Sequence, residues 1–216
     1  EEKKDIAFAV GVSRSTDDSQ IFISTGENSS NEVYLVPADN PTAPLTLVRG
    51  RQPDKQYSVD AAHGILWILT NDKHVNFSIA TADPKKPGVW TEQVAGSEGT
   101  YLRGIAAPRD HLLIGARIDG LDQLTLRDYA TGKEERVPFR EASYSAAFTG
   151  NPEYAPDSYR LSYSSMVTPG TVYDYHPKEQ RLDVRKVQEI PSGYDPSQYV
   201  TERLMITARD GAKVPV

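Results

Sequence analysis

Cysteine is missing from this chain of 216 residues, and histidine and methionine are scarce, with four and two copies. The lack of cysteine excludes disulfides, thiolate nucleophiles and cysteine-based metal sites. It does not identify the compartment, because a protein without disulfides is viable in both the cytosol and the periplasm. We expect a cytoplasmic location, with the periplasm as the alternative.

Long apolar runs and a surplus of positive charge are missing too. No run approaches the ~18 consecutive apolar residues of a membrane span, and the first ten residues, EEKKDIAFAV, lack the basic-then-apolar order of a secretory signal. The chain has 24 Lys and Arg against 30 Asp and Glu, a net charge of −6, whereas a nucleic-acid surface needs clustered basic residues. We therefore expect a globular protein with neither a membrane span nor a nucleic-acid partner.

A helical period is almost absent as well. Segments that alternate or stay apolar for a few residues recur along the chain, rich in Val, Ile, Tyr and Thr and bounded by Gly, Pro, Asn and Asp. This pattern is typical of strands joined by turns. The sequence therefore predicts an all-β protein.

The strand-like segments repeat at a nearly fixed spacing. Four of them start 44, 47 and 48 residues apart, and a second set follows each member of the first after 12 residues. The first set is IFIS from Ile21, ILWI from Ile65, LLIG from Leu112 and RLSY from Arg160. One further strand-like segment precedes each pair and another follows it, which gives four units of four strands.

Such a repeat indicates a β-propeller, whose four-stranded sheets bury their faces against neighbouring sheets. Two stacked β-sandwiches are the alternative, but a sandwich has no reason to repeat the same internal offset. We predict a partial β-propeller over residues 1–188. Its units are 1–49, 50–95, 96–139 and 140–188.

The repeat stops after residue 188. Residues 189–199 contain Pro, Gly and Ser and are predicted to be an interdomain linker, and residues 200–216 form a hairpin that turns at Asp210 and Gly211. A terminal hairpin without a sheet leaves unpaired backbone groups. We therefore expect the natural chain to continue into a second domain.

The last third of the sequence resembles a known family. YSSMVTP from Tyr163, KVQEIPSGYDPSQY from Lys186 and ARDGAKVPV from Ala208 are similar to the junction between propeller and catalytic domain in the prolyl oligopeptidase family of serine peptidases, and within it to the oligopeptidase B (protease II) group. A weaker similarity covers EEKKDIAFAVGVSRS at the start and residues 55–79.

The resemblance implies a seven-bladed propeller that caps an α/β-hydrolase domain, with short peptides cleaved after Lys or Arg between the two. This chain would hold about four blades and the first hairpin of the hydrolase, and would gate substrate access without being catalytic alone. Its partners would be its own hydrolase domain and short peptides. Residues 192–198 would act as the hinge, and two uncovered apolar blade faces would favour self-association.

No residue is assigned a catalytic, cofactor-binding or metal role, and no cofactor is expected. In the family the triad would lie beyond Val216, and the nearest matches to a G-x-S-x-G elbow, at Gly11 and Gly96, fall at or between strands. The isolated histidines are interpreted as polar surface residues, and the adjacent carboxylates as solvated turn charge, since strand neighbours point to opposite faces. These residues are His63, His74, His111 and His176, and Asp17, Asp18, Glu134 and Glu135.

Two weaker groups complete the candidates. Tyr154, Tyr159 and Tyr163 could line a peptide groove, although packing between sheets is favoured. Asp60 and Glu98 are unranked candidates for acidic residues that face a substrate cavity and meet a Lys or Arg side chain. The alternative function is a stand-alone β-propeller that binds a partner or a small ligand.

Overall fold

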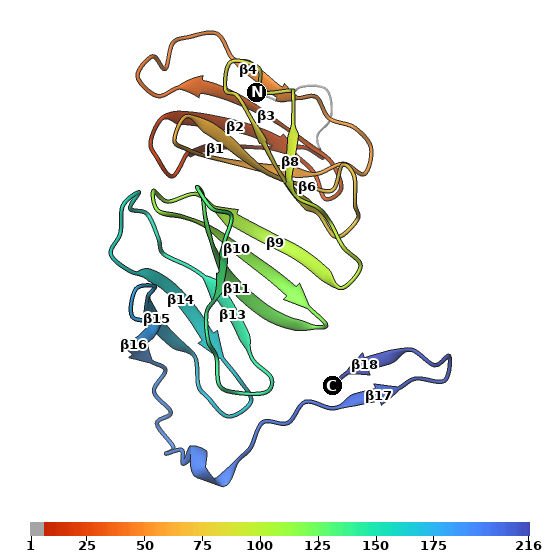
Figure 1. The fold of residues 1–216 in the computed structure, drawn as a ribbon, viewed down its shortest axis with the longest axis vertical. Helices are drawn as coiled ribbons and strands as arrows, with labels where there is room; N and C mark the ends of the chain where they lie inside the picture. Colours follow the sequence, from red (N-terminus) through yellow and green to blue (C-terminus); the bar gives the residue numbers. More distant parts are fainter. Residues whose placement is uncertain (1–6) are drawn as a thin grey trace.

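The computed structural model describes residues 7–216. Within them it contains four four-stranded antiparallel sheets and one two-stranded sheet. The four sheets follow one another along the longest axis of the molecule in chain order (Figure 1). Residues 1–6 of the predicted first unit lie outside the described residues.

Each four-stranded sheet is built from consecutive strands, so the chain completes one sheet before it begins the next. The first sheet contains β1 (Ala9–Arg14), β2 (Gln20–Gly26), β3 (Asn31–Pro37) and β4 (Thr46–Arg49), and the second contains β5 (Tyr57–Ala62), β6 (Ile65–Thr70), β7 (Ser78–Ala82) and β8 (Thr91–Val94). The third contains β9 (Thr100–Ala106), β10 (His111–Ile118), β11 (Leu121–Asp128) and β12 (Glu134–Arg136), and the fourth contains β13 (Ser145–Phe148), β14 (Tyr159–Ser164), β15 (Thr171–His176) and β16 (Arg181–Val187).

The prediction of an all-β chain with four-stranded units is confirmed. Every predicted strand position carries a strand, and the strands pair in the predicted order. The number of blades in the whole protein stays a prediction. Among residues 7–216, no helix has the length and apolar character needed to cross a membrane.

Three apolar clusters hold the sheets together, one between each pair of successive sheets. Phe22 and Leu35 of the first sheet pack with Leu66 and Ile68 of the second, and the next two clusters join the second sheet to the third and the third to the fourth. Alternation along each strand sends successive side chains to opposite faces. An inner sheet can therefore contribute to two clusters at once.

The two end faces of the stack differ in chemistry. Val12 of β1 lies opposite Ile23 of β2, which lies opposite Tyr34 of β3, so these side chains share the outward face of the first sheet. On the outward face of the fourth sheet, Arg160 of β14 lies opposite Asp174 of β15 and is ion-paired to it. The prediction of two apolar end faces is therefore wrong for the fourth sheet.

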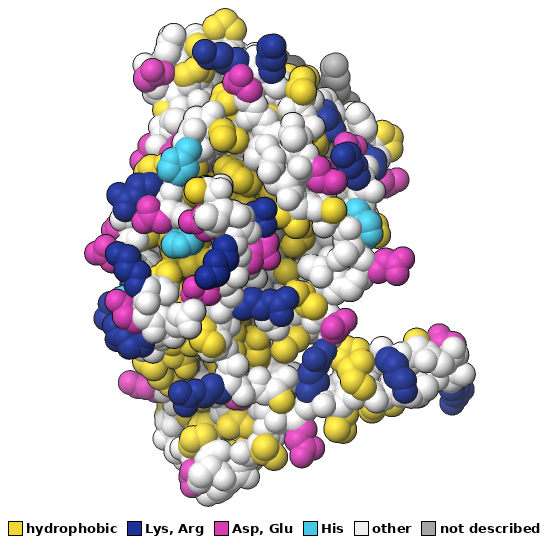
Figure 2. Space-filling model, in the orientation of Figure 1, with side chains coloured by type: hydrophobic (Ala, Val, Ile, Leu, Met, Phe, Trp, Pro, Cys, Tyr) yellow, Lys and Arg dark blue, Asp and Glu magenta, His cyan; other side chains and the backbone are white. Residues whose placement is uncertain are grey.

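Beyond β16 the chain leaves the sheets. The connector, residues 188–204, is irregular apart from a 3-10 helix, η1 (Pro196–Gln198), and β17 (Met205–Thr207) then pairs with β18 (Lys213–Pro215). Figure 1 shows this hairpin projecting away from the stacked sheets, and Figure 2 shows hydrophobic side chains on its surface. The assignment of the hairpin to a hydrolase domain stays a prediction.

Candidate functional site

Two arginines and one buried aspartate form a compact cluster on the third sheet. Arg103 on β9 donates from Nη1 to Oδ1 of Asp122 on β11 at 3.0 Å, and Arg117 on β10 donates from Nε to the same oxygen at 3.1 Å. The other carboxylate oxygen accepts from the backbone N of Ala146 at 3.2 Å. Asp122 therefore orients both guanidinium groups and ties the third sheet to the first strand of the fourth.

Two hollows adjoin this cluster. One, of about 310 Å³, is lined by Arg103 and by apolar or small residues of β9, β10, β11 and β13. The other, of about 480 Å³, is lined by Arg103, Arg117 and Asp122 together with residues of β13, β14 and β15. The two guanidinium groups thus lie where an apolar hollow meets a more polar one.

Hydrogen bonds to a carboxylate and to a backbone carbonyl fasten the connector beside the fourth sheet. Glu141, in the loop between β12 and β13, accepts hydrogen bonds from the hydroxyl groups of Ser165 and Thr168, in the turn between β14 and β15. It also accepts from Thr201 Oγ1 of the connector at 3.1 Å. Nearby, the hydroxyl of Tyr194 donates to the backbone carbonyl of Val167.

The protonation of Glu141 is coupled to these contacts. Burial acts to raise the pKa of this carboxyl, but the hydrogen bonds from Ser165, Thr168 and Thr201 outweigh burial, so the pKa lies below its usual value. Glu141 is therefore kept ionised, and its carboxylate accepts hydrogen bonds from the turn between β14 and β15 and from the connector.

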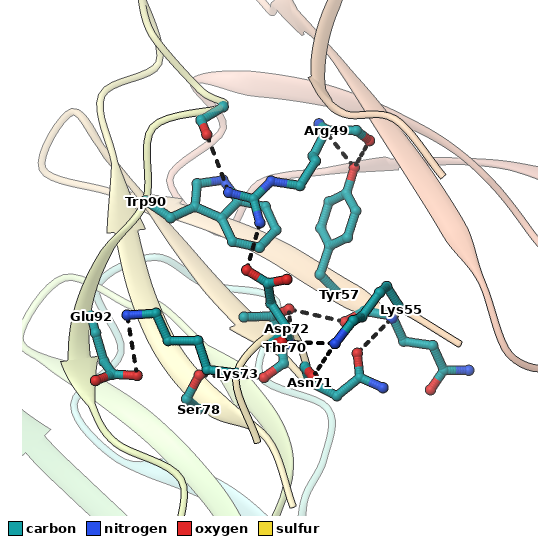
Figure 3. A network of polar contacts seen from close by, with 12 residues as sticks. Arg49, Lys55, Tyr57, Thr70, Asn71, Asp72, Lys73, Ser78, Trp90 and Glu92 are labelled. Carbon is teal, nitrogen blue, oxygen red and sulfur yellow. Dashed lines mark hydrogen bonds and ion pairs between the residues drawn. The ribbon is translucent and has the colours of Figure 1, made fainter. Parts of the chain in front are cut away.

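A second polar network joins the first two sheets and is structural (Figure 3). The Arg49 guanidinium lies 3.4 Å from the centroid of the Trp90 ring and donates to Asp72 Oδ2 at 2.8 Å. The Tyr57 hydroxyl donates to the Arg49 carbonyl at 2.5 Å and accepts from Val33 N at 2.8 Å. Burial raises the pKa of Tyr57 to about 12, so this hydroxyl stays neutral.

The two acidic candidates lie in different surroundings. Asp60 is buried and accepts from Thr16 N and Thr16 Oγ1 of the first sheet and from Ala107 N of the third, at 2.8, 2.6 and 2.7 Å. Its carboxylate therefore joins three sheets and is occupied by protein donors. Glu98 is exposed, in the loop before β9, where its backbone carbonyl accepts from Asn76 Nδ2.

The four histidines are dispersed, each with local partners. His63 Nε2 lies 2.6 Å from the Arg109 carbonyl, His74 Nδ1 accepts from Asn76 N, and His111 Nδ1 lies 3.0 Å from the Tyr159 hydroxyl. His176 lies beside Asp183. Within the described residues, no group of three or more His, Asp or Glu side chains is placed to share a metal ion.

The paired carboxylates engage separate partners. Asp17 accepts from Ser15 and Ser19 in the turn after β1, while Asp18 pairs with Arg14 at 2.6 Å. On β12, Glu134 pairs with Arg127, whereas Glu135 accepts from the Tyr175 hydroxyl. In neither pair do the two carboxylates share a partner, so neither pair forms a joint acid–base site.

The three tyrosine candidates pack between sheets. Tyr159 and Tyr163 belong to the cluster between the third and fourth sheets, and Tyr154 packs against the cluster between the second and third. Burial raises the pKa of both Tyr159 and Tyr163. Their contribution is to sheet packing, the interpretation that the sequence favoured.

Sequence reasoning missed Arg103, Arg117, Asp122 and Glu141. Two of the partners of Glu141, Ser165 and Thr168, lie within the YSSMVTP segment, which was recognised only as a family signature. Nothing in the spacing of Arg103 and Asp122 distinguishes them from other strand charges, because their contact depends on three-dimensional pairing of β9, β10 and β11.

Consecutive four-stranded antiparallel sheets that pack face to face are the blades from which proteins of the β-propeller class are built. Residues 1–188 match the family model described as the N-terminal beta-propeller domain of prolyl oligopeptidase. The chain belongs to this family of S9 peptidases, and the predicted resemblance is confirmed.

Curated relatives carry peptidase names. The chain is 36% identical to dipeptidyl aminopeptidase BI of Pseudoxanthomonas mexicana over 220 residues, which cover 100% of this chain and 30% of that protein. It is 28% identical to protease 2 of Moraxella lacunata, over 100% of this chain and 31% of the relative. The chain thus spans under a third of the length of these relatives.

Solved structures agree with this fold. Oligopeptidase B from Leishmania major superposes with a TM-score of 0.88 at 26% identity, over 99% of this chain and 32% of that one. Oligopeptidase B from Trypanosoma brucei, in a closed form with covalently bound antipain, gives a TM-score of 0.87 at 26% identity, with 99% and 32% coverage.

Proposed function

We propose that this chain is the substrate-access part of a serine-type oligopeptidase that hydrolyses short peptides after Lys or Arg. The observation that carries the proposal is the propeller match over residues 1–188 together with the likeness to oligopeptidase B across 99% of the chain. In this proposal the catalytic groups belong to a hydrolase domain that follows the hairpin, and the chain by itself is not catalytic.

The proposed mechanism is exclusion. Stacked sheets and a facing hydrolase domain would enclose the reacting bond, so that short flexible peptides reach it and folded proteins do not. Enclosure also removes bulk water from the site. Access then requires the two domains to separate and close again, a motion that sets turnover in many enclosed enzymes.

The connector is the proposed hinge. Gly193 has a φ of 83°, in the left-handed region, and an added Cβ would meet no atom within 4 Å. On its far side, Tyr194 and Thr201 hold the connector to the fourth sheet and to Glu141. Residues 192–198 therefore combine a permissive backbone at Gly193 with a polar contact at Tyr194 that can break and re-form, and Thr201 adds a second contact just beyond them.

The experiment replaces Gly193 in the full-length protein. Gly193→Pro forces φ to about −65°, which is incompatible with the observed turn, and we expect a several-fold change in kcat on an Arg-containing peptide. Gly193→Asn is the matched control, since Asn tolerates the left-handed region. Unchanged kinetics in both variants would contradict the hinge, and absence of cleavage by the unmodified protein would contradict the proposed activity.

The identity to dipeptidyl aminopeptidase BI supports a second candidate, removal of dipeptides from the amino end of a peptide. Both candidates use the same enclosed site but differ in the bond that is cut. Mass spectrometry of products from a ten-residue peptide with an internal Arg and a free or acetylated amino terminus separates them. Cleavage after Arg in the acetylated peptide supports the oligopeptidase, and release of dipeptides only from the free peptide supports the dipeptidyl aminopeptidase.

A further inference from the structure

A β-bulge places Arg103 out of the regular ladder. Gly115 of β10 lies opposite Gly104 of β9, but the next residue, Ala116, lies opposite Leu102, so Arg103 is the extra residue. In the first, second and fourth sheets the register shift lies between the third and fourth strands instead. Because bulges redirect side chains and recur beside functional sites, the departure at Arg103 is a local feature that needs an explanation.

The charges around Arg103 do not cancel. Arg103 and Arg117 both contact Oδ1 of Asp122, and the residues that line the two hollows include no other charged side chain. Two cations against one anion leave a net charge of +1. The guanidinium-bearing side chains are 48% and 47% exposed, whereas Asp122 is 6% exposed. The negative partner is thus buried while the positive ones remain accessible.

The adjoining hollow is open because small residues line it. An added Cβ at Gly104 would meet nothing within 4 Å, and at Gly115 its nearest neighbour would be the Gly104 carbonyl at 3.9 Å. Alanines at positions 106, 116, 146 and 147 continue the small-residue lining, while Leu113 and Phe148 add apolar surface. The space of about 310 Å³ falls in the range of small-ligand pockets.

We propose that Arg103 and Arg117 bind a carboxylate of a short peptide, whose neighbouring apolar side chain occupies the hollow between the third sheet and β13. A guanidinium group is planar and matches a carboxylate through two parallel hydrogen bonds. Asp122 fixes the orientation of both arginines before the ligand arrives, which lowers the ordering cost of binding. The carboxylate comes from the peptide's carboxyl terminus or from an Asp or Glu side chain.

The peptide nature of the ligand rests on the proposed function, while the charge and the shape are properties of the chain itself. The cluster lies near the junction, because Arg117 and Asp122 flank the turn whose Asp119 carbonyl accepts from Arg203 of the connector. A peptide enclosed between the sheets and a following domain would meet this surface.

The fourth sheet supplies a matched control. Arg160 and Arg185 both contact buried Asp174, at 2.9 and 2.5 Å, so the same combination of two arginines and one aspartate occurs there. Neither of these arginines lines the two hollows described above. Arg160 therefore tests whether an exposed arginine pair is enough, or whether the apolar hollow beside Arg103 is required.

The test is isothermal titration calorimetry of the 216-residue chain with three peptides. They are N-acetyl-Ala-Leu as the free acid, its carboxamide, and N-acetyl-Ala-Glu-carboxamide. We expect the free acid to bind at least tenfold more tightly than the carboxamide, a difference of about 1.4 kcal/mol. Binding of the Glu peptide at the same strength as the free acid would assign the site to any peptide carboxylate. Weak binding of the Glu peptide would restrict it to the carboxyl terminus.

Four variants sharpen the result. Arg103→Gln should lower the affinity for the free acid to that for the carboxamide, and Arg103→Lys should restore part of the preference for the acid. Arg160→Gln should leave both affinities unchanged. Gly104→Val adds side-chain volume inside the hollow without a backbone clash, so it should weaken the free acid and the carboxamide together. Circular dichroism verifies the fold of each variant.

Three outcomes would overturn the proposal. The unmodified chain could bind acid and carboxamide equally, or Arg160→Gln could lose as much affinity for the free acid as Arg103→Gln does. In the third, sodium acetate displaces the peptide at the concentration at which the peptide itself binds. No arm depends on hydrolysis. A full-length protein that cleaves no peptide would therefore contradict the proposed function and leave the titration to judge this site.

Discussion

The first and fourth sheets close the described stack with faces of opposite chemistry. Val10, Val12 and Ile23 make the outward face of the first sheet apolar, with Val12 73% exposed. The outward face of the fourth sheet carries the Arg160, Asp174 and Arg185 ion cluster. Covering an apolar face with another surface is favourable because it removes that face from water. The charged groups of an ion cluster already have hydrogen-bond partners and do not need such a cover. The two ends therefore need different neighbours.

The comparison shows what a repeat does and does not determine. Each of the two sheets contains four consecutive antiparallel strands in chain order, with nearly the same spacing along the sequence. Their inward faces belong to similar apolar clusters, because each packs on another sheet of the same kind. Only the outward faces differ, so the repeat fixes the sheet while the individual side chains fix what it can pack against.

The largest contrast is expected between an inner cluster and the apolar end face. Leu161 is fully buried between the third and fourth sheets, so Leu161→Ala should lower the free energy of unfolding by about 2–5 kcal/mol. Val12→Ala removes methyl groups that are already in water and should change it by less than about 0.5 kcal/mol. Urea unfolding at one protein concentration, low enough to keep the chain monomeric, measures both changes, and similar midpoint shifts would show that the end face is buried within the monomer.

Breaking the charged face should have the next largest effect. Asp174→Ala leaves Arg160 and Arg185 side by side without their carboxylate, and we expect a loss of about 1–3 kcal/mol because Asp174 is buried while its partners are half exposed. Arg14→Ala, at the exposed pair of Arg14 and Asp18 on the first sheet, should leave stability nearly unchanged. A loss at Arg14 equal to that at Asp174 would contradict the distinction between the two faces.

Much of the fold could be predicted from the sequence. A spacing of 44 to 48 residues with a constant offset of 12 identifies repeated sheets because each strand must alternate to fill a cluster on both sides. The chemistry of an end face could not be predicted in the same way. The strand RLSY contains Leu161 and Tyr163, which pack inward, but its pattern does not show that Arg160 shares Asp174 with Arg185 on the other side.

The site was less predictable than the fold. Asp60 was selected because it is acidic, yet its carboxylate is occupied by backbone and hydroxyl donors from two neighbouring sheets. Arg103 owes its position to a bulge that has no sequence signature beyond the adjacent Gly104. Glu141 depends on contacts with residues up to 60 positions away, which local patterns do not encode.

The apolar end face is expected to drive self-association of the 216-residue chain. Val12→Lys places a charge on the edge strand of that face, opposite Ile23, and should weaken association at least tenfold, whereas Ser162→Lys on the charged end should leave it unchanged. Sedimentation velocity across a dilution series measures the dissociation constant of each variant. A stable monomer for the unmodified chain would contradict the expectation, and equal effects of the two lysines would place the contact elsewhere.

The smallest expected effect is a difference in how the stability contributed by the two end faces depends on pH. The hydrogen bond from Arg160 lowers the pKa of Asp174 below the ordinary value of an aspartate, burial opposes this lowering, and Arg185 adds to it. Since the folded state favours the carboxylate, the stabilisation is present above about pH 4 and is lost as pH falls through the lowered folded-state pKa. The stability difference between the unmodified chain and Asp174→Asn should therefore shrink below pH 4. Val12→Ala carries no titrating group and should show a difference independent of pH; a difference at Asp174 that stays constant down to pH 2 would mean that the ion cluster does not stabilise the fold.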